Sequence, residues 1–153
     1  MKKVEYVRCN DLKFINLNGL YNEDYTSLKN LDYTILKVIE VEAPISMSML
    51  KARLREAMEI KKISQKALDI INERLDYYCI KRTSNLYEEI LWPKSGEFKI
   101  DYLRVNEDRQ IYDIAYQELI NLSKDFINEL LKVSRGEKSS EQLRQEVLKK
   151  YAR

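Results

Sequence analysis

The helical spacing of apolar residues in the first half of the chain most constrains what this sequence can fold into. Apolar residues there recur every three or four positions in three successive segments, which is the spacing of one buried helix face. The spacing predicts three helices, at residues 25–41, 47–59 and 65–79. The first half of the chain is therefore predicted to be mainly helical.

The breaks between these helices carry suitable boundary residues. Pro44 ends the first helix, because the residue before a proline avoids helical geometry. A serine hydroxyl can accept a hydrogen bond from a free backbone N–H in the first turn of a helix. Ser46 or Ser48 is therefore predicted to cap the second helix, and Ser64 the third.

Two strand-like segments follow the third helix, at residues 79–83 and 87–92, with a turn between them. The order helix, helix, helix, strand, turn, strand over residues 25–93 is that of a winged helix. In that fold the second and third helices form a helix-turn-helix, and the two strands form a wing beside it. A plain helical bundle with a hairpin would give the same pattern, so this alternative stays open.

The two ends of the chain are less regular. A long helix is predicted at 112–133 with Gly136 after it, and a Ser-x-x-Gln capping box at 139–142 begins a last helix. Residues 97–110 are read as a mostly polar connector. The predicted fold class is mainly α (α+β), with an N-terminal arm or hairpin at 1–24, a winged helix-turn-helix with a two-stranded wing at 25–95, and a linker with a C-terminal helical pair at 96–153.

Composition excludes most templates of small enzymes. The chain of 153 residues has no histidine, and its three glycines stand far apart, so no Ser–His pair, His-ligated metal site or glycine-rich phosphate loop can be written. Carboxylates such as Glu88-Glu89 and Glu107-Asp108 permit a metal-dependent nuclease by residue type, but no Asp…Glu-x-Lys arrangement supports one. We therefore predict no catalysis, no cofactor and no metal. No leader or membrane span is apparent, so a cytoplasmic protein is expected.

Several short motifs follow one another in a definite order. They are Glu42, Pro44 and Ile45, then Leu50, Arg53 and Leu54, Ile70 and Ile71, residues 90–93 (Ile-Leu-Trp-Pro), residues 101–104 (Asp-Tyr-Leu-Arg), residues 109–114 (Arg-Gln-Ile-Tyr-Asp-Ile), and the pair Glu118-Leu119. In this order and spacing they resemble an uncharacterised winged-helix-like accessory domain near the C-terminus of very large superfamily-one DNA helicases. The resemblance covers about residues 30–131.

The resemblance has two departures and one main implication. The family's typical run reads V-x-x-E-G-P-I-H, whereas this chain has Ala43 in place of the glycine and Ser46 in place of the histidine. Any role of that imidazole therefore does not carry over. The resemblance implies a non-catalytic accessory domain in DNA processing, with a helicase or nuclease as parent chain or partner. No helicase motor is present, so the chain would be an excised piece or a free-standing relative.

The distribution of charge agrees with a DNA partner. The net charge of the whole chain is +2, but residues 51–82 contain nine basic and five acidic side chains, a net charge of +4. The side chains that we expect to contact nucleic acid are Lys51, Arg55, Lys61, Lys62, Lys66, Lys81 and Arg82. The alternative is that they are ordinary solvated side chains.

The third helix is less suited to reading bases. Asp69, Glu73 and Asp76 on its outward face would oppose a phosphate backbone, so phosphate or shape contacts are favoured over base readout. Gln65 and Asn72 could contact bases, and Tyr77, Tyr78, Tyr87 and Trp92 could stack on unpaired bases, although Trp92 is expected to be buried. Duplex and single-stranded DNA both remain open as ligands.

The C-terminal helices suggest a second reading of the function. Two helices without a third leave part of an apolar face to cover, including Leu130, Leu143 and Val147. This face could pack back on the first domain or pair with a second chain as a homodimer. The alternative function is therefore a protein-interaction or dimerisation module without nucleic-acid binding. No membrane contact is expected.

Overall fold

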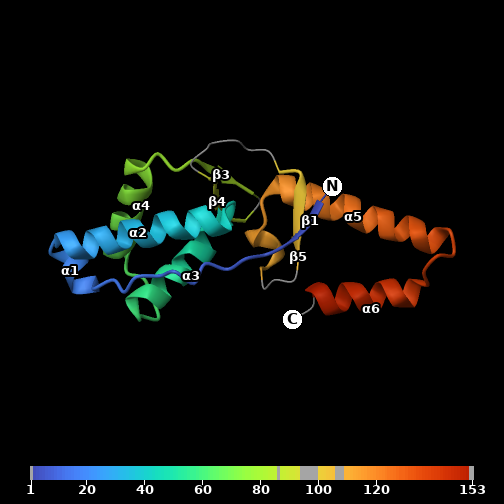
Figure 1. The fold of residues 1–153 in the computed structure, drawn as a ribbon, viewed down its shortest axis with the longest axis horizontal. Helices are drawn as coiled ribbons and strands as arrows, with labels where there is room; N and C mark the ends of the chain where they lie inside the picture. The colour runs from blue at the N-terminus through green and yellow to red at the C-terminus, as the bar shows by residue number, and fades with distance from the viewer. Residues whose placement is uncertain (1, 86, 94–99, 106–108, 152–153) are drawn as a thin grey trace. The chain divides into compact units, whose positions relative to one another are not determined.

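A computed structural model describes residues 2–85, 87–93, 100–105 and 109–151 (Figure 1). The chain is mainly helical, with two small sheets in these described ranges. It divides into two compact units. The central unit is formed by residues 7–98 and 112–115, and the terminal unit by residues 1–6, 99–111 and 116–153.

The central unit contains four helices in its described part, and capping residues set where they begin. The helices are α1 (Leu17–Tyr21), α2 (Tyr25–Glu42), α3 (Met47–Met58) and α4 (Gln65–Tyr77). The hydroxyl of Ser46 caps α3 by accepting a hydrogen bond from Met49 N at 3.1 Å, and Ser64 caps α4 in the same way. Of the two caps considered for α3, Ser46 is therefore the one used.

A three-stranded antiparallel sheet completes the central unit. Its strands are β2 (Ile45–Ser46), β3 (Arg82–Ser84) and β4 (Glu89–Leu91), in the spatial order β2-β4-β3. The first predicted strand at 79–83 was placed too early, because Cys79 takes a left-handed conformation and Ile80 N donates to Leu75 O. These residues end α4 instead of extending the sheet.

The core of the central unit is built from the predicted apolar faces. Many of its fully buried side chains come from α2, α3 and α4, including Leu31, Ile35, Leu50, Leu54, Ile71 and Leu75. Trp92 follows β4 and is buried, as the sequence predicted, and its indole N–H donates to Thr83 Oγ1 at 2.6 Å. The buried tryptophan therefore makes a polar contact as well as filling the core.

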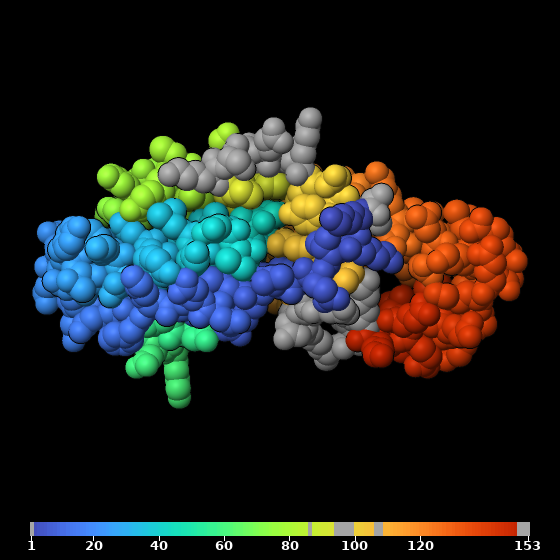
Figure 2. Space-filling model, in the orientation of Figure 1, coloured from blue at the N-terminus to red at the C-terminus, as the bar shows by residue number. Residues whose placement is uncertain are grey.

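An extended segment runs along α2 and α3 before the first helix, as the blue atoms in Figure 2 show. Ile15 is buried and its N–H donates to Ala57 O at 3.0 Å. The residues after it form the helix α1, within the range 1–24 where the sequence predicted an arm or a hairpin. Gly19 lies so close to α2 that a Cβ on it would meet Ser27 Oγ at 2.0 Å. The glycine thus allows α1 and α2 to approach.

The terminal unit combines both ends of the described chain. Its elements are β1 (Lys2–Glu5), β5 (Tyr102–Val105), α5 (Tyr116–Ser134) and α6 (Ser140–Tyr151), and the short 3₁₀ helix η1 (Ile111–Asp113) precedes α5. β1 and β5 pair in parallel, with Lys2 opposite Tyr102. The N-terminal strand therefore does not form a local hairpin, and the predicted connector contains a strand; its residues 97–99 and 106–108 lie outside the described ranges.

The boundary between α5 and α6 is the one the sequence predicted. Gly136 has φ +75°, and the N–H of Glu137 donates to Lys132 O at 2.9 Å, so the glycine ends α5 in a left-handed turn. Ser139 and Gln142 then exchange backbone–side-chain hydrogen bonds at 2.9 and 3.1 Å, which confirms the capping box. None of the helices in the described ranges is long and apolar enough to cross a membrane.

Glu129 links α5 to the start of α6 in a pH-dependent way. Lys138 and Lys132 donate hydrogen bonds to its carboxylate at 2.5 and 3.0 Å, and they lower the pKa of Glu129 from 4.5 to about 2. The unfolded chain keeps the ordinary pKa, so this stabilisation is complete above pH 4.5 and is lost as the pH falls toward 2.

We therefore expect the backbone amides of α6 to lose protection from hydrogen exchange between pH 4.5 and pH 2, after correction for intrinsic exchange. Glu129→Gln should remove most of this pH dependence, whereas Glu141→Gln, a change at an exposed site on α6, should keep it. Equal protection of α6 in the native protein at pH 6 and pH 3 would contradict the assignment.

Candidate nucleic-acid interface

The segment between α3 and α4 presents a basic turn at the start of α4. Glu59 ends α3 in a left-handed conformation, and Ile60 N donates to Arg55 O at 3.1 Å. The chain then crosses to Ser64 through the exposed Lys61 and Lys62. Both lysines therefore lie close to the N-terminal end of α4, where the helix dipole also favours anions.

Five of the seven predicted contact residues lie on α3, in the turn that follows it and in the first turn of α4. Lys51 and Arg55 lie one turn apart on α3, Lys61 and Lys62 lie in the turn, and Lys66 is exposed in the first turn of α4. Lys66 Nζ lies 4.8 Å from the centre of the Tyr21 ring. Within the described ranges, none of the five forms an ion pair with a carboxylate.

Two carboxylates lie on the last turn of α3 and at its end, next to the basic turn. Glu56 on α3 is already paired with Arg8, so its charge is compensated. Glu59 is exposed at the end of α3. The turn and the adjoining helix ends therefore keep a positive excess.

Arg82, at the start of β3, has a structural role instead. Its guanidinium donates to Asn72 Oδ1 and Glu89 Oε1, each at 3.1 Å, and lies 3.4 Å from Asp76 Oδ1. These contacts hold β3 against the end of α4. Arg82 is thus not displayed for a ligand, whereas Lys81, whose carbonyl accepts from Trp92 N, keeps an exposed side chain.

Two other basic side chains of residues 51–82 form ion pairs within the central unit. Arg53 binds Glu42 through two hydrogen bonds of 2.9 and 2.8 Å, and Arg74 binds Asp32 at 2.8 and 2.7 Å. The hydrogen bond with Asp32 also raises the pKa of the Arg74 guanidinium. The net charge of +4 counted from the sequence therefore overstates the number of cations on the surface that can bind a ligand.

The exposed face of α4 is acidic beyond its first turn. Asp69, Glu73 and Asp76 are all exposed. The two amides considered for base reading are both engaged, since Gln65 Nε2 donates to Asp69 Oδ1 at 2.9 Å and Asn72 accepts from Arg82. The middle of α4 is therefore poorly suited to the major groove.

The aromatic side chains divide into buried and exposed ones. Trp92 is buried, and Tyr78 donates from its hydroxyl to Asp32 at 2.8 Å, so neither is free to stack on a base. Tyr77 is 68% exposed and meets Tyr78 edge to face, with 5.0 Å between ring centres, and Tyr87 is 76% exposed. Only Tyr77 and Tyr87 among these four could stack on unpaired bases.

The adjacent carboxylates at 88–89 are also engaged. Glu88 accepts from the backbone N–H and the hydroxyl of Ser48, at 2.9 and 2.8 Å, and Glu89 accepts from Arg82. Glu107 and Asp108 lie outside the described residues. In the part of the chain that the structure describes, no three acidic or cysteine side chains gather where they could hold a metal ion.

Five of the residues that carry the family resemblance form two buried ion-pair clusters. Glu42 is fully buried against Arg53, and Glu118 is fully buried against Arg104 and Arg109. One sequence signal pointed to the first cluster, because Glu42 continues the apolar spacing of Leu31, Ile35 and Val38 and so occupies a core position. These residues stabilise the two units rather than form a site for a ligand.

No known family model matches the chain. The same is true of curated protein sequences and of solved structures. The assignment of a function therefore depends on the geometry of the fold and of its surface.

Proposed function

We propose that the central unit is a winged helix that binds DNA, as a non-catalytic accessory module of a helicase- or nuclease-type DNA-processing system. The sequence resemblance suggests the system, and the arrangement of the elements supports the fold. α2, β2, α3, α4, β3 and β4 follow in the order of a winged helix, and β4 lies between the other two strands. In this reading α3 and α4 are the helix-turn-helix, and β3 and β4 form the wing.

The observation that carries the DNA proposal is the group of five basic side chains without a carboxylate partner. We call Lys51, Arg55, Lys61, Lys62 and Lys66 the basic turn surface. In a helix-turn-helix, the N-terminal residues of the second helix and the first helix approach the DNA. The basic turn surface occupies these positions, whereas the acidic residues of α4 lie farther along the helix. Contacts to phosphates at the tip of α4, without deep insertion of the helix, satisfy both observations.

The test is reversal of charge on the turn. The double variant Lys61→Glu/Lys62→Glu is expected to weaken binding to a generic 20-base-pair duplex by at least about tenfold at low salt, because up to two phosphate contacts become repulsions. The slope of log affinity against log salt should become shallower by up to about 1.8, which corresponds to two phosphate contacts. Fluorescence anisotropy across a salt series measures both quantities.

A matched control separates local contacts from net charge. Lys29→Glu/Lys149→Glu makes the same change in charge at exposed positions on α2 and α6 that are not part of the basic turn surface, and should leave most of the affinity. Equal losses of affinity in both double variants would show that the net charge of the protein alone causes the effect. Absence of binding to duplex and single-stranded DNA at low salt would remove the DNA proposal and favour the protein-interaction alternative.

A further inference from the structure

Helix α5 packs with its polar side inward. Glu118 and Asn121 are its buried residues, and Asn121 Nδ2 donates to the carbonyls of Ile100 and Tyr102 at 3.1 and 2.9 Å. Asp125, one turn later, is paired with Lys3 at 2.8 Å. The side of α5 that faces the rest of the terminal unit is thus held by hydrogen bonds and ion pairs, not by an apolar stripe.

The apolar side of α5 is left in solvent. Six large side chains on it are between 43% and 54% exposed: Tyr116, Ile120, Phe126, Ile127, Leu130 and Leu131. Surface helices of a folded unit ordinarily turn such a stripe toward the core. The sequence predicted an uncovered apolar face here, and of its three named residues Leu143 is buried, Val147 is partly buried and Leu130 is exposed.

The spacing on this face is that of a helix pair. The central positions are Tyr116, Ile120, Ser123, Ile127, Leu130 and Ser134, which step by four, three, four, three and four residues. This is the a/d spacing of a coiled-coil seam. A seam of this kind is covered by another helix that lies nearly parallel or antiparallel to it.

The pattern is also symmetric about its own middle. Reading outward from position 125, Ser123 corresponds to Ile127, Ile120 to Leu130, and Tyr116 to Ser134. Two copies of α5 in antiparallel orientation would therefore place a large side chain opposite a serine in four of the six layers. The central layers bring Ser123 against Ile127 of a second copy, and the next layers join Ile120 to Leu130. A face that complements itself in this way is what a two-fold symmetric dimer requires.

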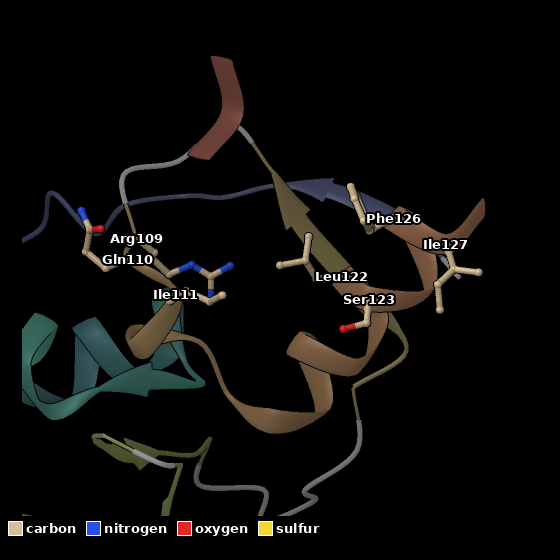
Figure 3. Close-up of a pocket in the computed structure, with 7 residues that line it drawn as sticks. All are labelled: Arg109, Gln110, Ile111, Leu122, Ser123, Phe126 and Ile127. Atoms are coloured by element: carbon tan, nitrogen blue, oxygen red, sulfur yellow. The ribbon is translucent and has the colours of Figure 1, made fainter. Parts of the chain in front are cut away.

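A groove lies beside the small residue of the seam. Its volume is about 540 Å³, and it is lined by Arg109, Gln110, Ile111, Leu122, Ser123, Phe126 and Ile127. Figure 3 shows residues 109–111 on one side of this space and the α5 residues on the other. An isoleucine side chain that arrives opposite Ser123 would enter the space that the serine leaves.

We propose that α5 pairs with α5 of a second copy of this chain in antiparallel orientation, and that Ile127 of each protomer fills the groove beside Ser123 of its partner. The exposed apolar area of α5 is close to what a small dimer interface needs. Six side chains that each leave roughly 80 Å² exposed supply roughly 1,000 Å² for two protomers, before any polar rim is counted, against about 1,200 Å² in small specific interfaces. The dimer does not depend on DNA binding, because α5 carries none of the basic turn surface.

The first test measures oligomeric state. Sedimentation equilibrium of the full chain should show a dimer at micromolar concentration, and Ile127→Glu should raise the dissociation constant by about 30-fold or more, because a charge would enter the apolar centre. Asn128→Glu, an exposed position on the same helix but outside the seam, should leave the dimer intact. Circular dichroism should show unchanged helix content in both variants. A monomer at all concentrations, or a dimer insensitive to Ile127→Glu, overturns the proposal.

The second test determines orientation. In a background with Cys9 and Cys79 replaced by serine, chains with Ile120→Cys are mixed with chains carrying Leu130→Cys and oxidised. Antiparallel pairing predicts disulfides between the two kinds of chain and almost none within either kind, because like positions would lie about 15 Å apart along the helix. Disulfides that form within each kind of chain would indicate parallel pairing and overturn the proposed dimer.

Discussion

Replacing Glu42 by Ala is expected to lower the free energy of unfolding of the central unit by about 3–5 kcal/mol. The Glu42 carboxylate is fully buried, accepts two hydrogen bonds from Arg53, and accepts a third from the backbone N–H of Cys9 at 3.2 Å. Its removal leaves a guanidinium that is only 12% exposed without this buried counter-charge. Urea unfolding followed by fluorescence of Trp92, the single tryptophan of the chain, measures the change.

Two further variants test the cause of this loss. Glu40→Ala changes an exposed carboxylate on the same helix, paired only with Lys37, and should cost less than about 0.5 kcal/mol. The double change Glu42→Leu/Arg53→Met replaces both partners by apolar groups and should destabilise less than Glu42→Ala alone. If Glu42→Ala and Glu40→Ala proved equal in stability, the buried pair would have no special role.

Replacing Glu118 by Ala should destabilise the terminal unit by a similar amount, about 3–5 kcal/mol. Glu118 is the shared acceptor of Arg104, at 3.0 Å, and of Arg109, and both guanidiniums are less than 10% exposed. Both guanidiniums also lie about 5 Å from the centre of the Tyr6 ring. Without the carboxylate, both arginines would lose the buried counter-charge that they share.

The two units allow this effect to be localised. Hydrogen exchange of the β5 amides should become faster in Glu118→Ala, whereas the unfolding curve measured by Trp92 in the central unit should change much less. Glu141→Ala, at an exposed position on α6, is the matched control and should alter neither signal. Unchanged exchange in β5 would show that the arginines are stabilised without Glu118.

Local sequence patterns were sufficient to predict most of the helical structure of the central unit. The apolar spacing, Pro44 and the two serine caps placed α2, α3 and α4 within a few residues, because these signals act within a few turns of chain. No local pattern in the sequence predicted the pairing of β1 with β5. A parallel pair between distant strands is chosen by tertiary packing, and neither four-residue strand has a turn that would connect it to its partner.

The positions of the basic and apolar side chains on the surface could be predicted only in part. Counting charges placed the positive excess on residues 51–82, but a count cannot tell which of these cations bind carboxylates inside the fold. Arg53, Arg74 and Arg82 are bound to carboxylates, whereas Lys61 and Lys62 remain exposed. The periodicity of α5 likewise located its apolar stripe without showing that the opposite, polar side is the one that packs.

The pairing of β1 with β5 also has a consequence for the order of folding. Lys2 lies opposite Tyr102, so the chain must close a loop of about a hundred residues before this sheet can form, at an entropic cost that grows with loop length. The helices α1 to α4 and the strands β2 to β4 of the central unit all lie between those two strands in sequence. During synthesis on a ribosome, the central unit can therefore fold first, while the N-terminal strand remains without its partner until β5 has emerged.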